Sequence, residues 1–587
     1  MKLSKVRLKG FRNLKKSTIN LNNKTLILGA NDVGKTNLIW ALRLLLDKSL
    51  SDYDIEPRDS DFYAYQETNA FSILLCFTEV DDDCVVSKMK GKISDDSKLY
   101  LKYEALRDSE TYAKTYKLYA GPCATALEEI DSRYYLKVLN LKYIGSRRDL
   151  HNYVNREKNY LFQIAKDNRD EAQTNADNTL YSEIQEDLKN IDNKIPKLNF
   201  VSNATSKINE ELGKLSLHHT KQEVAFDAAT SNVDSFIRSV AISSKCNGKN
   251  VLIGGDGRLN QIYLALWASR NELTEESLSE VTIFCIEEPE AHLHPHQQRK
   301  LAEYLNASLK GQVLITSHSP QIASEFSPNS IVRLFNDNGA TQAASNGCSQ
   351  IIDDAFNDFG YRMSIIPAEA FFANVVFLIE GPSEEIFYKT LAKSLSLDLD
   401  QLNISILMVD GIGFGTFIRI LDSLEIEWVL RTDNDIFKIP KKDEYRFAGV
   451  DRCVKYYRDF FDSNKTMESI LNTYESDLRW AGTDRPFPKN IASAEKISEE
   501  LIEYNMYLSE IDFENDLFNS PLKQEIKDFF SDCEEDEIVE KMQSYKAVYM
   551  YQFLKKKKDK LSCLKDDNLA EPLYACKEIV EKLNGAD

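Results

Sequence analysis

The sequence lacks long hydrophobic runs and paired cysteines. Its apolar runs have the length of single strands and end in charged residues, so no transmembrane helix is expected. The opening MKLSKVRLKGFRNL has Lys and Arg but neither the apolar core nor the small-residue cleavage site of a signal peptide. The ten cysteines, scattered from Cys76 to Cys576, include no CxxC pair, which argues against a zinc ribbon or a disulfide framework. These absences predict a cytoplasmic protein without a membrane partner.

The chain also lacks a net positive charge. Its 73 Lys and Arg against 93 Asp and Glu give a formal net charge of −20 over 587 residues. This charge excludes a protein that coats nucleic acid by its net charge, but it leaves open a local basic groove or carboxylates that reach phosphates through metal ions. With 43% hydrophobic residues the chain can bury several cores, and its length suggests roughly three or four domains.

Strand and helix patterns divide the chain into four segments. Residues 1–154 are typical of strands, a glycine turn and a helix, whereas 155–245 are polar with apolar residues at helical spacing. Strand patterns return in 246–350, and 351–587 contain three apolar strands separated by helices, followed by an acidic helical tail. We therefore expect an α/β protein built from these four segments.

The first motif is a phosphate-binding loop. The sequence GANDVGKT, which begins at Gly29, fits GxxxxGK[ST], with an apolar strand before it and an amphipathic helix after it. In such a loop backbone N–H groups surround phosphate oxygens, the lysine reaches the β and γ phosphates, and the threonine is a Mg²⁺ ligand. The residues expected at the nucleotide are Asn31, Asp32, Gly34, Lys35 and Thr36. The motif predicts binding of ATP with Mg²⁺.

Two acids follow a second apolar strand far along the chain. Residues 281–286 are apolar, as in a buried parallel sheet, and lead to Glu287 and Glu288 at the edge where open α/β sheets bind ligands. One carboxylate can hold the magnesium shell while the other orients an attacking water. The next strand, 313–316, leads to His318, which is in a position to sense a γ-phosphate. An exposed acidic turn and a structural histidine are the alternatives.

These motifs resemble the ABC-type ATPase heads of the RecF/SMC branch. The resemblance implies that Glu288 is the catalytic glutamate, that Glu287 replaces the usual Walker B aspartate and that Pro289 to His294 form the D-loop region. It also implies that His318 is the switch histidine. Gly255 lies in IGGDG, where the family has an LSGGQ signature, and no convincing Q-loop is present, so hydrolysis of ATP stays open. Such heads usually complete their site across a dimer, which implies a homodimer or higher homo-oligomer with 155–245 as a helical dimerisation insertion.

Three apolar strands in the C-terminal half each end in an acid. Glu380, Asp410 and Asp433 directly follow these strands, and Asp435 comes two residues after Asp433. Strands joined by helices form parallel βαβ units, so the acids gather along one edge of a sheet. Clustered carboxylates repel one another, and hard divalent cations with oxygen ligands relieve that repulsion. Two such ions can activate a water and stabilise the leaving oxygen of a phosphodiester. Acidic helix caps are the alternative.

The C-terminal motifs resemble a second family. EGPSE, which begins at Glu380, and DND, which begins at Asp433, look like the Toprim fold. An ABC head followed by a Toprim domain is similar to the OLD family of nucleases, and EAFFA, TDND and YLSEIDFEND most resemble the nuclease subunits of Gabija anti-phage systems. The resemblance implies an ATP-gated, metal-dependent endonuclease of double-stranded DNA, with Mg²⁺, Mn²⁺ or Ca²⁺ at the Toprim site. It also implies a role in antiviral defence and a helicase-like second subunit.

The resemblance further implies two metal sites. The ligands would be Glu380, Asp433 and Asp435 for one ion, and Glu384, Asp512 and Glu514 for the second. Glu384 lies four residues after Glu380, which is one helical turn and the same helix face. Asp512 and Glu514 alternate by two, as in an extended segment that presents both to one side. From spacing alone, a solvated acidic face remains the alternative for these late acids.

Lysines complete the predicted site. Lys546 corresponds to the family's late lysine, which would stabilise negative charge on the scissile phosphate, and Lys541 is a nearby competitor. The lysine run 555–558 is typical of a solubilising patch, with contact to DNA phosphates as the alternative. Two other functions stay open: a non-catalytic nucleotide switch that clamps DNA or a partner, and a topoisomerase-like strand passer. The latter needs a tyrosine nucleophile near the acids, for which no setting is recognisable.

Overall fold

The computed structural model describes most of the chain in two compact units. The described residues are 1–64, 68–145, 150–215, 224–225, 232–240, 242–246, 249–251, 255, 257–263, 265–266, 280–307, 311–337, 339–348, 368–409, 413–583 and 585. The first unit comprises Met1–Ile144, Glu280–Glu290 and Pro295–Asp587, and the second comprises Gly145–Ser279 and Ala291–His294. Asp410, and the two signature-like residues Gly254 and Asp256, lie outside the described residues.

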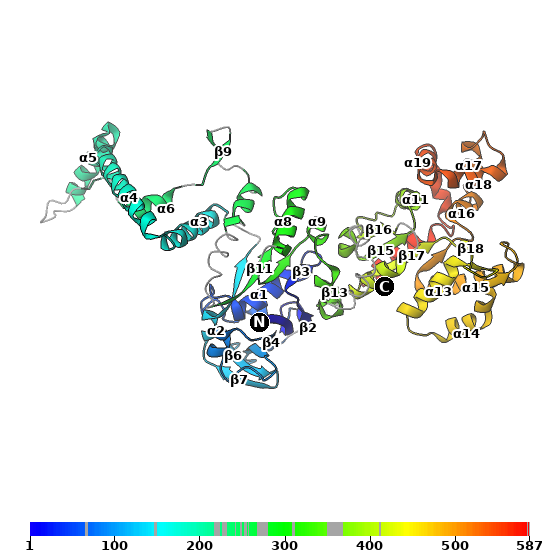
Figure 1. The fold of residues 1–587 in the computed structure, drawn as a ribbon, viewed down its shortest axis with the longest axis horizontal. Coiled ribbons are helices and arrows are strands. Elements are labelled where there is room, and N and C mark those ends of the chain that lie inside the picture. Colours follow the sequence, from blue (N-terminus) through cyan, green and yellow to red (C-terminus); the bar gives the residue numbers. More distant parts are fainter. Residues whose placement is uncertain are drawn as a thin grey trace. The chain divides into compact units, whose positions relative to one another are not determined.

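The N-terminal part of the first unit contains an antiparallel sheet (Figure 1). Its strand order is β2 (Leu14–Asn20), β1 (Lys2–Phe11), β4 (Ala70–Thr78), β5 (Leu99–Arg107), β6 (Lys114–Cys123) and β7 (Ala126–Ile130). Buried and more exposed residues alternate along β4 and β5, as expected of a sheet with one face on a core. A short helix, α2 (Asp83–Lys88), follows β4.

A second sheet carries the phosphate-binding loop. Its order is β14 (Ala340–Ala343), β13 (Ile331–Asp337), β3 (Lys24–Leu28), β12 (Gln312–Thr316), β11 (Val281–Glu287) and β8 (Leu139–Ile144). All neighbouring pairs are parallel except β13 with β14. Helix α1 (Lys35–Leu46) shares one hydrophobic core with both sheets, while α8 (Pro295–Ala307) and α9 (Pro320–Ala323) follow β11 and β12. β3 and β12, in the middle of this sheet, are almost entirely buried, which explains their continuous apolar runs.

The second unit is mainly helical. Its elements are α3 (Leu150–Asp167), α4 (Glu171–Asp192), α5 (Asn199–Leu215), α6 (Val233–Ser239), β9 (Ser244–Cys246) and β10 (Lys249–Val251). Several of its apolar side chains are exposed, among them Leu180, Ile191 and Phe200. The prediction of polar helices here is confirmed, whereas the segment boundaries and the dimerisation role stay predictions.

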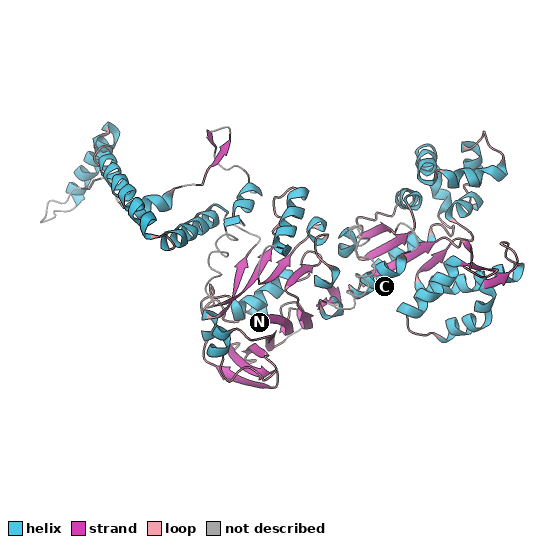
Figure 2. Ribbon diagram, viewed as in Figure 1, coloured by secondary structure: helices cyan, strands magenta, loops and turns pink. Residues whose placement is uncertain are grey.

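The C-terminal part of the first unit is built on a parallel sheet (Figure 2). Its order is β16 (Ile404–Met408), β15 (Val375–Ile379), β17 (Glu427–Thr432) and β21 (Met506–Leu508). A small antiparallel sheet consists of β18 (Ile436–Lys438), β19 (Glu444–Phe447) and β20 (Arg479–Ala481). The helices are α11 (Pro382–Ser394), α12 (Phe414–Ser423), α13 (Ala448–Phe460), α14 (Lys465–Tyr474), α15 (Pro488–Leu501), α16 (Phe513–Asn519), α17 (Lys523–Phe529), α18 (Ile538–Ser544), α19 (Lys546–Lys557) and α20 (Glu571–Leu583).

Arg333 of β13 links the two parallel sheets of this unit. Its Nη1 donates hydrogen bonds to the carbonyl oxygens of Leu424 at 3.0 Å and Glu425 at 2.7 Å, and Nη2 donates to the carbonyl of Ala373 at 3.3 Å. These carbonyls lie just before β17 and β15, while Arg333 itself is paired in register with Leu28, the last residue before the phosphate loop. The linkage therefore joins the strand beside the nucleotide loop to the starts of two acid-bearing strands.

None of the helices in the described part of the chain combines the length and the hydropathy that crossing a membrane requires.

Candidate functional site

The phosphate-binding loop has the backbone that its motif requires. Gly34 caps α1 with φ 98°, and a Cβ there would lie 2.4 Å from Asn13 Nδ2, so only glycine fits. Lys35 is 7% exposed, and its Nζ donates hydrogen bonds to the carbonyl oxygens of Gly29 and Ala30, both at 2.8 Å. The lysine thus lies inside the loop, while Asn31, Asp32 and Thr36 are exposed to an incoming ligand.

The charge of Lys35 depends on its surroundings. Burial lowers its pKa to about 8, although Glu288 and Asp32 act in the opposite direction. Nucleotide phosphates would favour the charged ammonium, so above pH 8 binding must take up a proton. We therefore expect nucleotide affinity to stay level between pH 6.5 and 7.5 and to weaken about tenfold per pH unit above 8. Titration with a fluorescent ATP analogue at pH 7 and pH 9 checks this, and equal dissociation constants at the two values would contradict it.

The two acids after β11 lie at the sheet edge near this loop. Glu287 is buried, and the Tyr143 hydroxyl donates to its Oε2 at 2.6 Å. Glu288 has a positive φ of 44°, and its Oε1 lies 3.3 Å from Nε2 of His318. Burial, followed by the charge of Lys35, lowers the pKa of His318, which favours its neutral form. The structure thus brings Lys35, Glu287, Glu288 and His318 together.

The resemblance to ABC-type ATPase heads placed Glu290 in the D-loop region, Pro289 to His294, but gave it no individual role. Its Oε1 accepts hydrogen bonds from Ser317 Oγ at 2.7 Å and from the backbone N–H of His318 at 2.8 Å. Burial raises its pKa. Glu290 therefore holds the turn that presents His318, and the signal available in the sequence was a third glutamate directly after Glu287, Glu288 and Pro289.

A cavity of about 190 Å³ adjoins Thr36 and Glu287. The side chains that line it are Arg12, Thr36, Ile39, Trp40, Arg43, Arg58, Tyr143 and Glu287. Arg12, also missed from sequence, donates to Asn37 Oδ1 at 2.9 Å and to Asp61 Oδ1 at 2.8 Å, and the Arg43 guanidinium lies 3.9 Å from the Tyr143 ring centroid. Three guanidinium groups make this cavity suited to an anionic ligand. Gly255 belongs to the second unit, where it is exposed with φ 88°.

The C-terminal acids meet at the carboxyl edge of the other parallel sheet. The chain runs from β15 to β16 on one side of it and then crosses to β17 on the other side. The strand order therefore reverses between β15 and β17, the strands that lead to Glu380 and Asp433, and open α/β sheets bind ligands at such a reversal. Glu380 Oε1 accepts hydrogen bonds from the Thr432 hydroxyl and from the Asp433 N–H, the latter at 2.9 Å. Asp433 Oδ1 in turn accepts from the Phe513 N–H at 2.9 Å. These contacts hold the two acids side by side.

Two spacing arguments from the sequence were wrong in their geometry. Glu380 precedes α11 and does not share a helix face with Glu384; instead Glu384 Oε2 caps the helix by accepting the N–H groups of Glu380 at 2.8 Å and Gly381 at 3.0 Å. Asp512 and Glu514 do not alternate along an extended segment, because Asp512 is the N-cap of α16 and Glu514 lies in its first turn. Capping, which uses local backbone donors, decided both arrangements.

The acids interact electrostatically across these elements. Burial raises the pKa of Asp433 to about 7, and Glu380 raises it further. Burial raises the pKa of Glu384 to about 8, opposed by Arg431. Burial also raises the pKa values of Asp435 and Glu514, and repulsion from Asp512 adds to the rise in both cases. Four of the six predicted metal ligands, Glu384, Asp433, Asp512 and Glu514, are buried, and Glu380 and Asp435 are partly buried beside them. We call these six residues the acid set.

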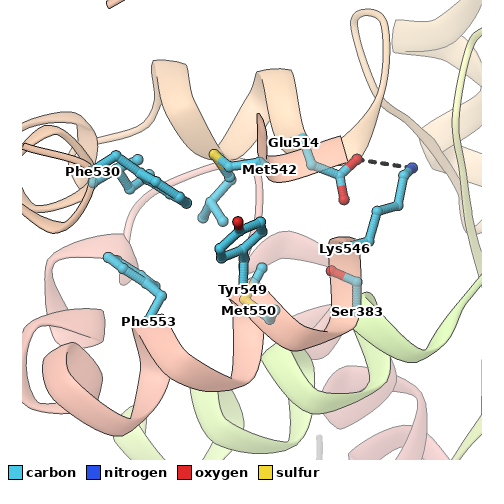
Figure 3. A pocket seen from close by; sticks show the side chains of 10 residues that line it. Ser383, Glu514, Phe530, Met542, Lys546, Tyr549, Met550 and Phe553 are labelled. Carbon is cyan, nitrogen blue, oxygen red and sulfur yellow. Dashed lines mark ion pairs between the residues drawn. The ribbon is translucent and has the colours of Figure 1, made fainter. Parts of the chain in front are cut away.

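Cations partly neutralise this set (Figure 3). Lys546 Nζ lies 2.9 Å from Glu514 Oε2 and 4.0 Å from Asp433 Oδ2, whereas Lys541 contacts Cys533 Sγ at 2.9 Å. The structure thus places Lys546 and not Lys541 beside the acids.

Two arginines missed from sequence also face these acids. Arg431, 3% exposed, lies 2.6 Å from Asp516 Oδ2 and 4.0 Å from Glu384 Oε1, and Arg452 lies 3.7 Å from Glu380 Oε1. A lone arginine in the apolar run EWVLRT was the sequence signal for Arg431.

The acid set fits a divalent cation by its donor chemistry. It offers only oxygen ligands, and Oε1 of Glu384 and Oε1 of Glu514 are buried without a hydrogen-bond partner. As they stand, however, the side chains of the described residues form no group of three or more that converges on one ion. Asp512 is engaged by Gln543 Nε2 at 2.6 Å and Glu514 by Lys546. Metal binding would therefore require side-chain rotation and release of Lys546.

Comparison with known families matches both halves of the chain. Residues 1–323 match the model of an AAA ATPase domain. Residues 371–435 match the TOPRIM domain of "Overcoming lysogenization defect protein-like" proteins. The second match spans β15 through Asp435, where Glu380 and Asp433 meet.

Two curated relatives align with most of the chain. Endonuclease GajA of Bacillus cereus (strain VD045) is 25% identical over 96% of this chain and 99% of its own. Old nuclease of Escherichia phage P2 is 22% identical over 81% of this chain and 84% of its own.

Among solved structures, SMC head domains resemble part of the fold. An SMC head bound to the C-terminal winged-helix domain of ScpA has a TM-score of 0.37 at 14% identity, covering 58% of this chain and 97% of its own. The SMC head domain of Thermotoga maritima has a TM-score of 0.30 at 15% identity, with 58% and 98% covered. The match over residues 1–323 shows that the chain belongs to the AAA ATPase domain family, and the match over 371–435 shows that it joins this ATPase to the TOPRIM domain of OLD-like proteins.

Proposed function

We propose that this protein is an ATP-binding, divalent-metal-dependent DNA endonuclease. The observation that carries the proposal is the meeting of Glu380, Asp433 and Lys546 at the carboxyl edge of a parallel sheet, in a chain that also carries a phosphate-binding loop. The two aligned relatives are named endonuclease and nuclease, which supports the same activity.

Each residue of the acid set has a role in this proposal. Glu380, Asp433 and Asp435 would hold one divalent ion, and Glu384, Asp512 and Glu514 a second; Mg²⁺ or Mn²⁺ there supplies an activated water and charge stabilisation at the leaving oxygen. Lys546 would leave Glu514 and place its ammonium against the scissile phosphate, where negative charge builds. Thr432 and the Asp433 N–H keep Glu380 oriented, because both donate to its Oε1.

The ATPase half would gate this site. ATP held by Lys35 and Thr36, with Glu287 at the Mg²⁺ and Glu288 as the hydrolytic glutamate, would set the conformation of the loop after β3. Arg333 would transmit this change to the acid site, since its hydrogen bonds fix the turns before β15 and β17. The resemblance to RecF/SMC heads implies completion of the nucleotide site by a second copy, with Gly255 facing the loop. The exposed apolar residues of α4 and α5 support pairing through the helical insertion.

A cleavage assay tests the proposal. We expect the purified chain to nick or cut supercoiled plasmid with Mg²⁺ or Mn²⁺ and to stop in excess EDTA, because the acids cannot bind phosphate without a cation. Product bands on agarose give the rates, measured with and without ATP. Cutting that persists in EDTA would contradict the metal role, and a constant rate with and without ATP would contradict gating.

One observation favours a non-catalytic alternative. The described acids are occupied by backbone amides, Lys546 and Arg452 rather than converging on an ion. Under this alternative the C-terminal domain is a scaffold and the chain is a nucleotide-dependent clamp on DNA or a partner. The same plasmid assay separates the two, since the clamp would bind DNA in the presence of ATP but would not cleave it, whichever metal is added.

Two further roles follow from the resemblance to Gabija nuclease subunits alone. We propose that the nuclease serves in antiviral defence and acts with a helicase-like second subunit. Both stay predictions for this chain.

A further inference from the structure

The outer face of α19 has features that the proposed chemistry does not use. Tyr545, Val548 and Tyr551 are 66%, 53% and 58% exposed. Val548 and Tyr551 are neighbours on the helix surface by their spacing of three residues, and Tyr545 is the N-cap residue directly before the helix; we call these three residues the outer row. The inner face holds Met550 and Phe553, which line the pocket in Figure 3 together with Tyr549. α19 thus has an apolar inner side that is buried and an aromatic outer row that is not.

This row starts at the acid set. Lys546, the first residue of α19, is the lysine 2.9 Å from Glu514. The helix packs against α11, which follows Glu380. From Lys546 to Lys555 the helix rises ~14 Å, at 1.5 Å per residue. The row therefore begins beside Lys546, which the proposed function places at the scissile phosphate, and continues along the helix from there.

Lysines continue the row at its far end. Lys555 and Lys558 are exposed, whereas Lys557 pairs with Glu525 and Lys556 Nζ lies 5.0 Å from the Phe529 ring centroid. Lysines in a last turn stabilise any helix, so the run by itself carries no inference. The exposed tyrosines are the independent observation, since two of them lie near one another beside these lysines and an aromatic ring is a surface on which a base can stack.

We infer that this face of α19 is the platform for a DNA strand whose bases are unpaired beside the cut site. Tyrosine rings stack on the faces of bases, which are available only where bases are unpaired, and lysines contact the backbone phosphates. At about 3.4 Å per nucleotide of one strand, the row accommodates about four nucleotides. The inference rests on the proposed function and adds its substrate: DNA that is locally opened.

Charge argues against a second copy of the chain as the occupant. Residues 545–558, YKAVYMYQFLKKKK, contain no carboxylate. Two copies that packed this face on itself would bring the exposed Lys555 and Lys558 of both copies together, whereas a nucleic-acid backbone supplies a phosphate at every nucleotide.

Binding measurements in EDTA, where no cleavage occurs, test the inference. Fluorescence anisotropy compares a fully paired 30-base-pair duplex with the same duplex carrying a four-nucleotide unpaired bubble. We expect wild type to favour the bubble and Tyr551→Ala to weaken bubble binding about five- to tenfold. Tyr545→Ala should act similarly, with paired-duplex affinity within about twofold for both. The matched control is Tyr112→Ala. Tyr112 is 68% exposed between β5 and β6, in the N-terminal part of the first unit, and its replacement should change neither affinity.

Three results would overturn the inference. The first is unchanged bubble affinity in both variants, and the second is an equal loss on bubble and paired duplex, which would mean backbone contact only. The third is a smaller assembly by light scattering in Tyr551→Ala, which would mean that the row lies between copies. Failure of the proposed function is distinguishable, because wild type would then cut no DNA with any metal while its binding preference could still be measured.

Discussion

Glu380→Ala is expected to lower plasmid cleavage by at least about 100-fold, with the protein still folded. Outer-shell partners of metal ligands alone cost 10–100-fold, so loss of a ligand should reach or pass the upper value. In this structure Glu380 also fixes Asp433, whose N–H it accepts at 2.9 Å, so the substitution disturbs two acids at once. Initial nicking rates in Mg²⁺ and in Mn²⁺ give the measurement.

Two companion variants make this result interpretable. Glu380→Gln keeps an oxygen that can accept from Thr432 and Asp433 but removes the charge, so it should fold like wild type and cut as poorly as Glu380→Ala. Glu385→Ala removes a nearby acid that pairs with Lys389 at 2.6 Å, outside the acid set, and should cut within about twofold of wild type. If Glu380→Gln cut at the wild-type rate in both metals, the assignment of Glu380 as a metal ligand would be wrong.

Arg431→Met is expected to destabilise the C-terminal domain strongly. Arg431 is 3% exposed and lies 2.6 Å from Asp516 and 4.0 Å from Glu384. Methionine of similar length would leave both acids buried without their cation, which typically costs about 3–5 kcal/mol. For a domain of this size, that corresponds to a fall of roughly 6 °C or more in the midpoint of its thermal transition. Differential scanning fluorimetry, with limited proteolysis to assign the transition, provides the measurement.

A surface arginine provides the matched control. Arg479, 53% exposed, pairs with Asp451 at 3.1 Å, and Arg479→Met should change stability by no more than about 1 kcal/mol. Adding Asp516→Asn to Arg431→Met should recover part of the loss, because the amide removes one buried charge. If Arg431→Met and Arg479→Met melted at the same temperature, the buried arginine would stabilise the domain no more than the exposed one, which would contradict the prediction.

The order of elements was largely predictable from the sequence. Continuous apolar runs such as 281–286 predicted buried parallel strands, and the structure has β11 there. The motif around Lys35 predicted the strand, loop and helix observed as β3 and α1. These predictions succeed because hydrophobic periodicity and glycine-rich loops are local properties of the chain.

The details of the acid site were less predictable. Glu384 and Asp512 were expected on a helix face and an extended segment, but each caps a helix instead. A cap depends on which backbone N–H groups are unpaired at a helix start, and a spacing of two or four residues does not reveal that. The contacts of Glu290, Arg431 and Arg452 were missed for a related reason, since their partners lie on other elements.

By itself, the sequence determined that this protein carries a nucleotide loop and a row of strands that end in acids, because those patterns are written in consecutive residues. Only the tertiary structure decided which lysine stands beside the acids, that Arg333 joins the two parallel sheets, and that Lys546 is paired with Glu514. These contacts connect residues far apart along the chain, and their existence depends on how strands order within a sheet and how helices pack on it.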